Sequence, residues 1–172
     1  SVGILTGTNT GIIDNIIIDG AISNITSKKT DSLNYFKYGC ITGNNSGTIT
    51  NSYSKTAIFT RGHAISTANC EAYVYKYVGG FAGYNTGLIE RSYSNTSISG
   101  DAISDKTAVS SRAYISDVTE GGFIASNNGK IYSCYSTGKI SSTSKSGGNF
   151  AGFIGGNGSS GDIRNCYTTT TV

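Results

Sequence analysis

Few residues in this chain have the chemistry that catalysis requires, because it contains a single histidine and ten acidic residues. His63 shares one segment with Cys70 and Glu71. A cysteine nucleophile needs an imidazole in contact with its thiol and a third group that orients the imidazole. Nothing in the spacing secures that contact. We therefore interpret His63 as a surface residue and expect the chain to be non-catalytic.

Metal and phosphate sites are not indicated either. Asp101, Asp105, Asp117 and Glu120 share one segment, but their spacing does not match a calcium-binding loop. The four cysteines contain no Cys-x-x-Cys pair, so they fit no zinc pattern. The stretch Asn127-Asn128-Gly129 is followed by neither a helical pattern nor a Lys-Ser/Thr pair, unlike a phosphate-binding loop. We expect no cofactor and no metal.

The composition narrows the possible partners. At 172 residues the chain is long enough for one domain with a core. A net charge of +3 with 13% charged residues is too mild to indicate binding to nucleic acid or to an anionic membrane. No apolar run is long enough for a transmembrane helix. We expect no nucleic-acid partner and no membrane insertion.

The chain is built from five copies of one unit. In each copy, two small residues, mostly glycine, flank an asparagine, and an isoleucine follows. All copies but the first then have a Ser-Tyr or Cys-Tyr pair. A branched aliphatic residue ends each unit. The copies span residues 2–23, 39–59, 79–99, 121–141 and 151–172. The asparagines are Asn9, Asn45, Asn85, Asn127 and Asn157, the isoleucines are Ile13, Ile49, Ile89, Ile131 and Ile163, and the tyrosines are Tyr53, Tyr93, Tyr135 and Tyr167. We interpret the chain, which ends inside a unit, as a piece of a longer protein.

This regularity predicts a fold. Glycine and asparagine accept the backbone of tight turns, and the flanking Ile-, Tyr-, Ser- and Thr-rich pieces suit short strands. One unit cannot bury its own apolar side, but stacked units can, through parallel ladders spaced by about 4.8 Å. The sequence therefore predicts an all-β parallel β-solenoid of about five coils. We expect it to be right-handed, because parallel crossovers overwhelmingly are.

Two columns of the predicted stack carry distinctive side chains. We expect the four repeated tyrosines to form a structural ladder that holds coils together. Cys134 and Cys166 occupy the column that holds Ser52 and Ser92 in earlier copies. Stacking places these two thiols side by side, which leaves two interpretations open. They form a ladder of free thiols, or they form a disulfide.

Segments of unequal length separate the units: residues 24–38, 60–78, 100–120 and 142–150. They leave each coil at the same place, so we expect them to emerge as neighbouring loops or strands on one face, where repeat proteins often bind ligands. Residues 72–78 alternate strictly, with a tyrosine at every second position, which predicts a strand that carries Tyr73, Tyr75 and Tyr77 on one side. The alternative is that the segments only cover the side of the solenoid. The candidate binding residues are Tyr73, Tyr75, Tyr77, Arg61, His63, Arg112 and Tyr114.

The third unit reads Gly79-Gly80-Phe81-Ala82-Gly83-Tyr84-Asn85-Thr86-Gly87-Leu88-Ile89 and continues through Arg91-Ser92-Tyr93-Ser94. It resembles the GLUG repeat of secreted bacterial immunoglobulin A peptidases and of cell-surface adhesin-like proteins. The first unit departs from this pattern, because it has Ile16-Ile17 in place of the Ser-Tyr or Cys-Tyr pair and lacks the leading double glycine.

The resemblance implies a non-catalytic module of a secreted or wall-attached bacterial protein, joined to other domains of that protein. Such a module would act as a spacer, or would bind a host glycoprotein such as immunoglobulin A, or a glycan. The alternative is a carbohydrate-active β-helix enzyme such as a polysaccharide lyase, which needs a basic residue and carboxylates that converge in a groove. No two neighbouring coils carry carboxylates in the same column of the repeat, so stacking creates no such pair, and we prefer the binding or spacer module.

Overall fold

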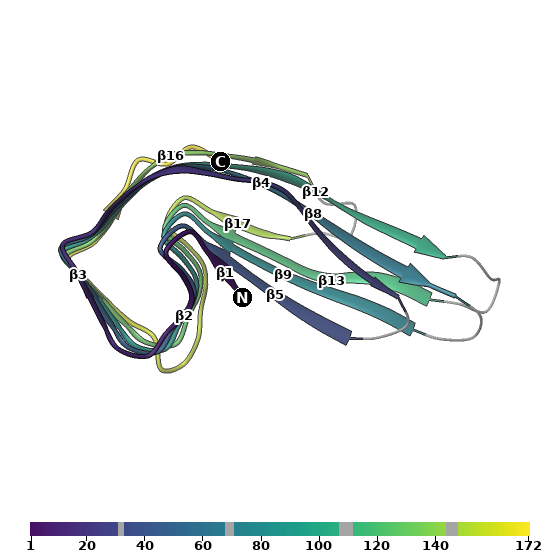
Figure 1. The fold of residues 1–172 in the computed structure, drawn as a ribbon, viewed down its shortest axis with the longest axis horizontal. Helices are drawn as coiled ribbons and strands as arrows, with labels where there is room; N and C mark the ends of the chain where they lie inside the picture. The colour runs from purple at the N-terminus through teal and green to yellow at the C-terminus, as the bar shows by residue number, and fades with distance from the viewer. Residues whose placement is uncertain (31–32, 68–70, 107–111, 144–147) are drawn as a thin grey trace.

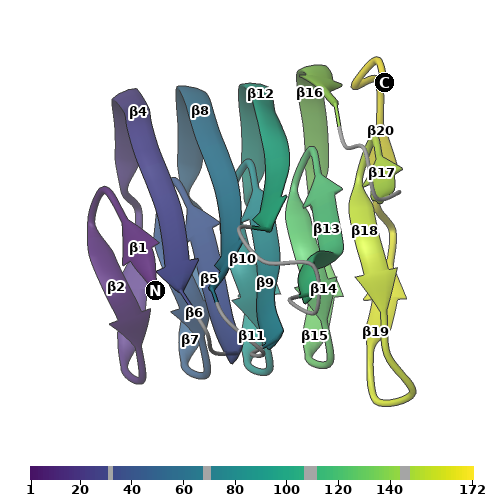
Figure 2. The ribbon, with the colours of Figure 1, turned by 90° about the vertical axis from the view of Figure 1, so that its right-hand side faces the viewer.

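Each coil of the chain contributes one strand to each of four parallel sheets in the computed structural model (Figure 1). The structure describes residues 1–30, 33–67, 71–106, 112–143 and 148–172, and no helix occurs among them. The chain runs clockwise around the stack in Figure 1, and Figure 2 shows that the first coil lies nearest the viewer of Figure 1. The fold is therefore a right-handed parallel β-solenoid of five coils, as the sequence predicts.

The chain passes through the four sheets in the same order in every coil. Sheet A contains β1 (Val2–Gly3), β5 (Leu33–Gly39), β9 (Glu71–Gly79), β13 (Arg112–Gly121) and β17 (Asn149–Ala151). Sheet B contains β2 (Thr6–Asn9), β6 (Thr42–Asn45), β10 (Ala82–Asn85), β14 (Ile124–Asn127) and β18 (Ile154–Asn157). Sheet C contains β3 (Ile12–Asp14), β7 (Thr48–Thr50), β11 (Leu88–Glu90), β15 (Lys130–Tyr132) and β19 (Asp162–Arg164). Sheet D contains β4 (Ile17–Thr30), β8 (Tyr53–Ser66), β12 (Tyr93–Lys106), β16 (Tyr135–Ser142) and β20 (Tyr167–Thr168).

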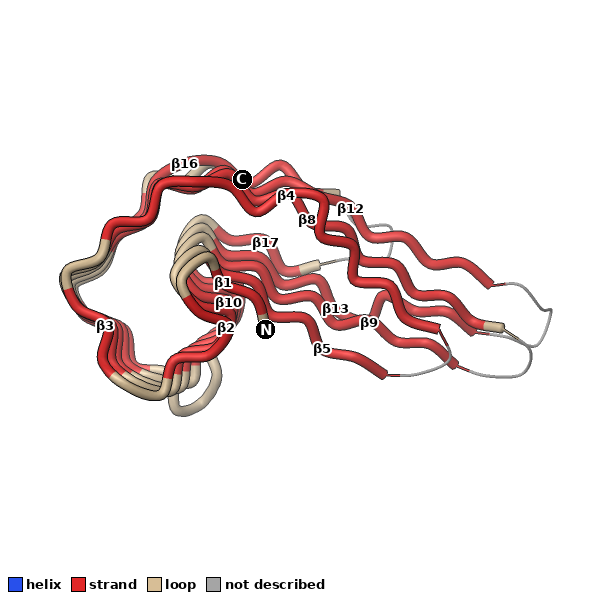
Figure 3. The backbone as a smooth tube through the Cα atoms, in the orientation of Figure 1, coloured by secondary structure: helices blue, strands red, loops and turns tan. Residues whose placement is uncertain are grey.

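The segments between the first four units extend sheets A and D beyond the ring of the solenoid (Figure 3). We call this extension the wing; it consists of the described parts of residues 24–38, 60–78 and 100–120. Side chains alternate between buried and exposed along β8 and β9, because the two sheets pack face to face. Ala64 of β8 packs with Ala72 and Val74 of β9 between the layers. The described parts of these segments are therefore mostly paired strands and not loops, and the strand predicted from the alternation over residues 72–78 is β9.

The repeated apolar residues form columns inside the ring. Ile49, Ile89 and Ile131 are aligned in register across sheet C and have no exposed surface. Phe81, Phe123 and Phe153 stack beside them, with ring centroids 4.7 and 5.1 Å apart. Parallel in-register pairing places like residues above one another, so a sequence column becomes a packed column.

The repeated asparagines form a hydrogen-bonded ladder through the whole stack. Each Nδ2 donates to the Oδ1 of the asparagine in the next coil at 2.8 Å, from Asn9 through to Asn157. The same amide groups bond to the glycine two residues further along the turn, as in the bond from the Gly129 amide to Asn127 Oδ1 at 3.1 Å. The side chains of Asn45, Asn85 and Asn127 are fully buried. Their polar atoms are thus paired within the protein, which burial requires.

Replacement of Ile89 tests the central apolar column. We expect Ile89→Ala to lower the free energy of unfolding by about 2–5 kcal/mol, the range for emptied core positions. Ile89→Asp should prevent folding, because it would bury an unpaired carboxylate. Denaturant unfolding followed by circular dichroism measures both effects. Leu88→Ala, at a half-buried position on the other face of the same strand, is the matched control and should lower the free energy of unfolding by less than Ile89→Ala does. A folded Ile89→Asp protein that melts like the parent would contradict the burial of this column.

Replacement of Asn85 by aspartate tests the ladder with almost no change in shape. A carboxylate oxygen would then replace the Nδ2 that donates to Asn127 Oδ1, and two acceptors would face each other. We expect a loss of more than about 2 kcal/mol, since an unpaired buried polar group costs about 1–3 kcal/mol and a charged one more. The same substitution at Asn95, which is exposed on β12, should leave the unfolding midpoint nearly unchanged. Equal effects at both positions would show that the ladder is not stabilising.

Candidate functional site

A recess of about 370 Å³ is lined by Tyr35, Lys37, Tyr77 and Tyr84. It lies at the inward corner where sheet A turns into sheet B (Figure 1). Tyr35 and Lys37 come from β5, Tyr77 from β9 and Tyr84 from β10. Strand alternation turns these side chains outward while their neighbours fill the core. The recess therefore brings three aromatic rings and one ammonium group together on the surface of two sheets.

Lys37 is the charged group of this recess. Its Nζ lies 4.0 Å from the centroid of the Tyr84 ring and donates a 3.4 Å hydrogen bond to Asn44 Oδ1. Partial burial lowers the pKa of the Lys37 ammonium. Tyr84 is held from its other end, because Asn128 Nδ2 donates to its hydroxyl at 2.7 Å. The lysine and the tyrosine thus support each other's position.

Further aromatic surface continues from the recess along the wing. Tyr35 stacks on Tyr75 with ring centroids 4.6 Å apart, because the register of β5 and β9 pairs these residues. Tyr35 retains about half of its surface exposed, at 52%. The result is a strip of tyrosine rings that leads from the recess along sheet A.

The structure divides the predicted binding residues between two opposite faces. Tyr73, Tyr75 and Tyr77 project from the outer face of sheet A beside the recess. Arg61 and His63 project from the outer face of sheet D, on the other side of the wing. The two groups therefore do not form the one surface that the sequence analysis proposed.

On sheet D, the Arg61 and His63 side chains pair with acids of the next coil. Arg61 Nε donates to Asp101 Oδ1 at 2.8 Å, and His63 Nε2 lies 2.7 Å from Asp105 Oδ2. The hydrogen bond to Asp101 raises the pKa of the Arg61 guanidinium. These contacts join neighbouring coils.

The remaining predicted residues lie at the start of β13. Arg112 is exposed, and its Nη1 lies 3.7 Å from Glu71 Oε1. The backbone of Tyr114 pairs with that of Tyr73, whereas the Tyr114 side chain lies outside the described part of the structure.

Sequence reasoning missed Tyr35, Lys37 and Tyr84. Tyr84 occupies a column whose other members are Thr8, Asn44, Ser126 and Gly156. A position that varies inside an otherwise regular repeat is not constrained by stacking, so the variation in this column could have marked Tyr84 as a candidate binding residue.

The predicted tyrosine ladder is confirmed, and it lies on the outer face of sheet D. Ring centroids are 4.1 Å apart for Tyr53 and Tyr93, 4.7 Å for Tyr93 and Tyr135, and 5.0 Å for Tyr135 and Tyr167. Stacking of this kind adds to stability beyond burial of area. We assign this column to structure and not to binding, because each inner ring has its faces covered by its neighbours.

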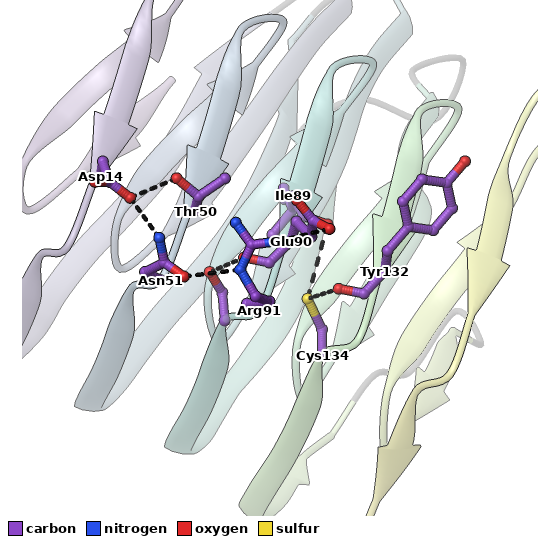
Figure 4. A network of polar contacts seen from close by, with 9 residues as sticks. Asp14, Thr50, Asn51, Ile89, Glu90, Arg91, Tyr132 and Cys134 are labelled. Atoms are coloured by element: carbon purple, nitrogen blue, oxygen red, sulfur yellow. Dashed lines mark hydrogen bonds and ion pairs between the residues drawn. The ribbon is translucent and has the colours of Figure 1, made fainter.

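A polar ladder follows the turn between sheets C and D (Figure 4). Thr50 Oγ1 and Asn51 Nδ2 donate to Asp14 Oδ1 at 2.6 and 2.7 Å, and Arg91 Nε donates to Asn51 Oδ1 at 2.9 Å. The first two bonds lower the pKa of the Asp14 carboxyl. Asn51 and Arg91 have φ of 51° and 47°, left-handed values that suit asparagine better than arginine. This network joins successive coils by exposed hydrogen bonds and forms no recess.

The three described thiols are poor nucleophiles. Cys40, Cys134 and Cys166 are all free, so the free-thiol interpretation of the last two is confirmed. Burial raises the pKa of Cys40 to about 11 and that of Cys134 to about 12, and it also raises that of Cys166. The thiolate, which is the reactive form, is therefore scarce at neutral pH. Cys70 lies outside the described residues.

No other cluster in the described residues indicates chemistry. They contain no group of three or more His, Cys, Asp or Glu side chains that could hold a metal. They also contain no helix long and apolar enough to cross a membrane. Comparison of the chain with models of known families, with curated proteins and with solved structures found no match.

Thiol labelling tests the placement of Cys134. We expect Cys40 and Cys134 to react slowly with an alkylating reagent in the native protein, because both are buried and protonated, and Cys166 to react faster, because it is only half-buried. All of them should react fully in denaturant. Peptide mass spectrometry after timed labelling measures each site separately. Native labelling of Cys134 as fast as in denaturant would contradict its inward position.

Proposed function

We propose that this chain is a non-catalytic repeat module of a secreted or surface-attached bacterial protein and that the corner recess binds a glycan. The observation that carries the proposal is the convergence of Tyr35, Lys37, Tyr77 and Tyr84 from two sheets on one concave site. Flat aromatic faces with a polar handle suit the apolar faces of sugar rings. Concave sites lined by aromatic groups with a few placed polar groups are the usual form of ligand pockets.

The charge of the recess favours an acidic sugar. Lys37 is the only charged group among the residues that line it, and the recess lining contains no carboxylate to repel an anion. A sugar carboxylate could pair with the Lys37 ammonium while the ring packs on tyrosine. The absence of a carboxylate beside Lys37 also speaks against lyase or glycosidase chemistry in this recess. We accordingly infer a binding site for an anionic glycan, such as one that carries sialic or uronic acid.

The GLUG resemblance supplies the setting of this proposal. It suggests a host glycoprotein, for example immunoglobulin A, as the source of the glycan, and other domains of a peptidase or an adhesin as neighbours in the same protein. The stacked sheets would make the module a stiff spacer as well as a binding unit. The two roles are compatible, because stacking uses the columns inside the ring and binding uses the outer corner.

Substitutions in the recess test the proposal. We would screen the chain on a glycan array and then titrate it with an oligosaccharide that contains sialic or uronic acid. We expect Tyr84→Ala to weaken binding roughly tenfold, on the order of the contribution of an aromatic contact, and Lys37→Met to remove the preference for acidic over neutral glycans. Arg61→Ala on the opposite face is the matched control and should bind like the parent.

The pH dependence provides a second readout. Binding of an anionic glycan should weaken as the pH rises through the pKa of Lys37, because the ammonium is charged only below it. The lowered pKa of Lys37 places this loss at a lower pH than for an exposed lysine. Lys37→Met should not show it. If the parent binds no glycan on the array, or if Tyr84→Ala binds equally well, the glycan proposal is wrong and a spacer role is the better account.

A further inference from the structure

The strip of tyrosine rings continues the recess along one strand of the wing. Tyr73, Tyr75 and Tyr77 occupy three successive outward positions of β9, and each side chain is half-buried. Outward positions recur about every 6.6 Å along a strand, so the strip from Tyr77 to Tyr73 spans roughly 13 Å, which is longer than one sugar ring. Strand β9 lies between β5 and β13 in sheet A. The outward face of this strip is therefore set by a neighbour on each side and does not depend on the ends of the stack.

Aromatic side chains follow the strand and not the stack. On sheet A, the column that contains Tyr77 continues in the next coil with Thr119, which is buried. On sheet B, the column that contains Tyr84 continues with Ser126. Along β9, in contrast, the two outward positions beyond Tyr77 are again tyrosines. A ligand that extends beyond the recess would therefore find further aromatic contacts in the direction of the wing.

Contacts within the protein hold the rings of the strip in place. The Tyr75 ring stacks on Tyr35 with centroids 4.6 Å apart and planes 17° from parallel. The Tyr73 hydroxyl donates to Glu71 Oε2 at 2.8 Å. Tyrosine offers a large contact area with little rotamer freedom to lose, and rings that are already fixed lose less still on binding. The strip thus presents the same combination of apolar ring surface and hydroxyl groups as the recess.

The two ends of this site differ in charge. Three tyrosines and the Lys37 ammonium line the recess. At the wing end, Glu71 is exposed, and Arg112 Nη1 lies 3.7 Å from Glu71 Oε1. The arginine charge is therefore balanced by a carboxylate, and a second acidic sugar at this end would approach Glu71. One acidic sugar in the recess and neutral sugars along the strip match this distribution of charge.

We propose that the recess and the tyrosine strip together bind an oligosaccharide in which one acidic sugar is followed by neutral sugars. This inference rests on the proposed glycan binding in the recess and adds the length and the charge pattern of the ligand. The acidic sugar pairs with Lys37, and the neutral sugars lie over Tyr75 and Tyr73. Uniformly acidic chains fit the site less well, because their later sugars would approach Glu71.

Probes of increasing length test this inference. Sialic acid and glucuronic acid would each be titrated free and then joined to one, two or three neutral sugars, by NMR titration, which also measures weak affinities. For at least one series, we expect the affinity of the parent to rise about three- to tenfold with each of the first two neutral sugars, the size of an aromatic contact, and then to level off. A chain of three copies of the same acidic sugar should bind no more tightly than its monomer.

Variants of the strip separate its contribution from that of the recess. Tyr75→Ala should keep the affinity of the parent for the free acidic sugar and lose the gain from the neutral sugars. Tyr73→Ala should keep the gain from the first neutral sugar and lose the gain from the second. Tyr132→Ala, at a half-buried tyrosine on the outer face of sheet C, is the matched control and should bind every probe like the parent. Melting followed by circular dichroism confirms that each variant is folded.

The outcomes distinguish this inference from the proposal on which it rests. If the parent binds a free acidic sugar and the neutral sugars add nothing, the recess binds a single sugar and the extended site is wrong. The extended site is also wrong if Tyr75→Ala and Tyr73→Ala both retain the full gain, or if the uniformly acidic chain gains as much affinity as the mixed one. A parent that binds neither series at any length overturns both the extended site and the glycan proposal.

Discussion

The buried asparagine ladder is the interaction on which the remainder of the structure depends. Each amide group joins neighbouring coils and also bonds to the glycine of its own turn. The side chain is short, so it reaches both partners only when the coils are in register. A shift of one residue would leave a buried amide unpaired, which costs more than the hydrogen bond itself contributes. The ladder therefore selects one alignment of the coils as well as stabilising it.

Once this register is fixed, the residues at each position of the unit form a column through the stack, and inward and outward columns have different roles. Inward columns must hold residues that pack on their own kind, such as Ile89 on Ile49 and Ile131. Outward columns have no such restriction and can change from coil to coil. Tyr84 and Lys37 lie in changing columns, and only there can one coil acquire a surface that its neighbours lack. On a solenoid of this kind, a binding site can therefore form only at outward positions that stacking does not constrain.

The same division explains how much the sequence predicted. The five coils, the isoleucine core and the tyrosine ladder were predictable because each depends on identical residues at identical spacing. The site was not, because Tyr84 meets Lys37 only where sheet A bends into sheet B, and that bend is a property of the folded coil. Arg61 and Tyr73 illustrate a second limit. Alternation shows correctly that each faces outward, but their strands lie in two layers that pack face to face, so their outward directions are opposite.

The wing lies beyond the reach of the asparagine ladder and needs another means of fixing register. Lys76 of β9 and Glu120 of β13 form an ion pair at 3.2 Å between neighbouring coils, with exposures of 1% and 0%. The Glu120 oxygens make no hydrogen bond in the described structure, and a buried pair of this kind contributes little net stability compared with apolar residues. The ion pair has a larger effect on the alternative registers of the two strands. The register of β13 on β9 shifts between Ile115 and Asp117, so slippage there is a real alternative, and a slipped strand would bury Lys76 without its partner. Breaking a buried pair costs about 3–5 kcal/mol, and this penalty makes the pair a register device where the repeat itself provides none.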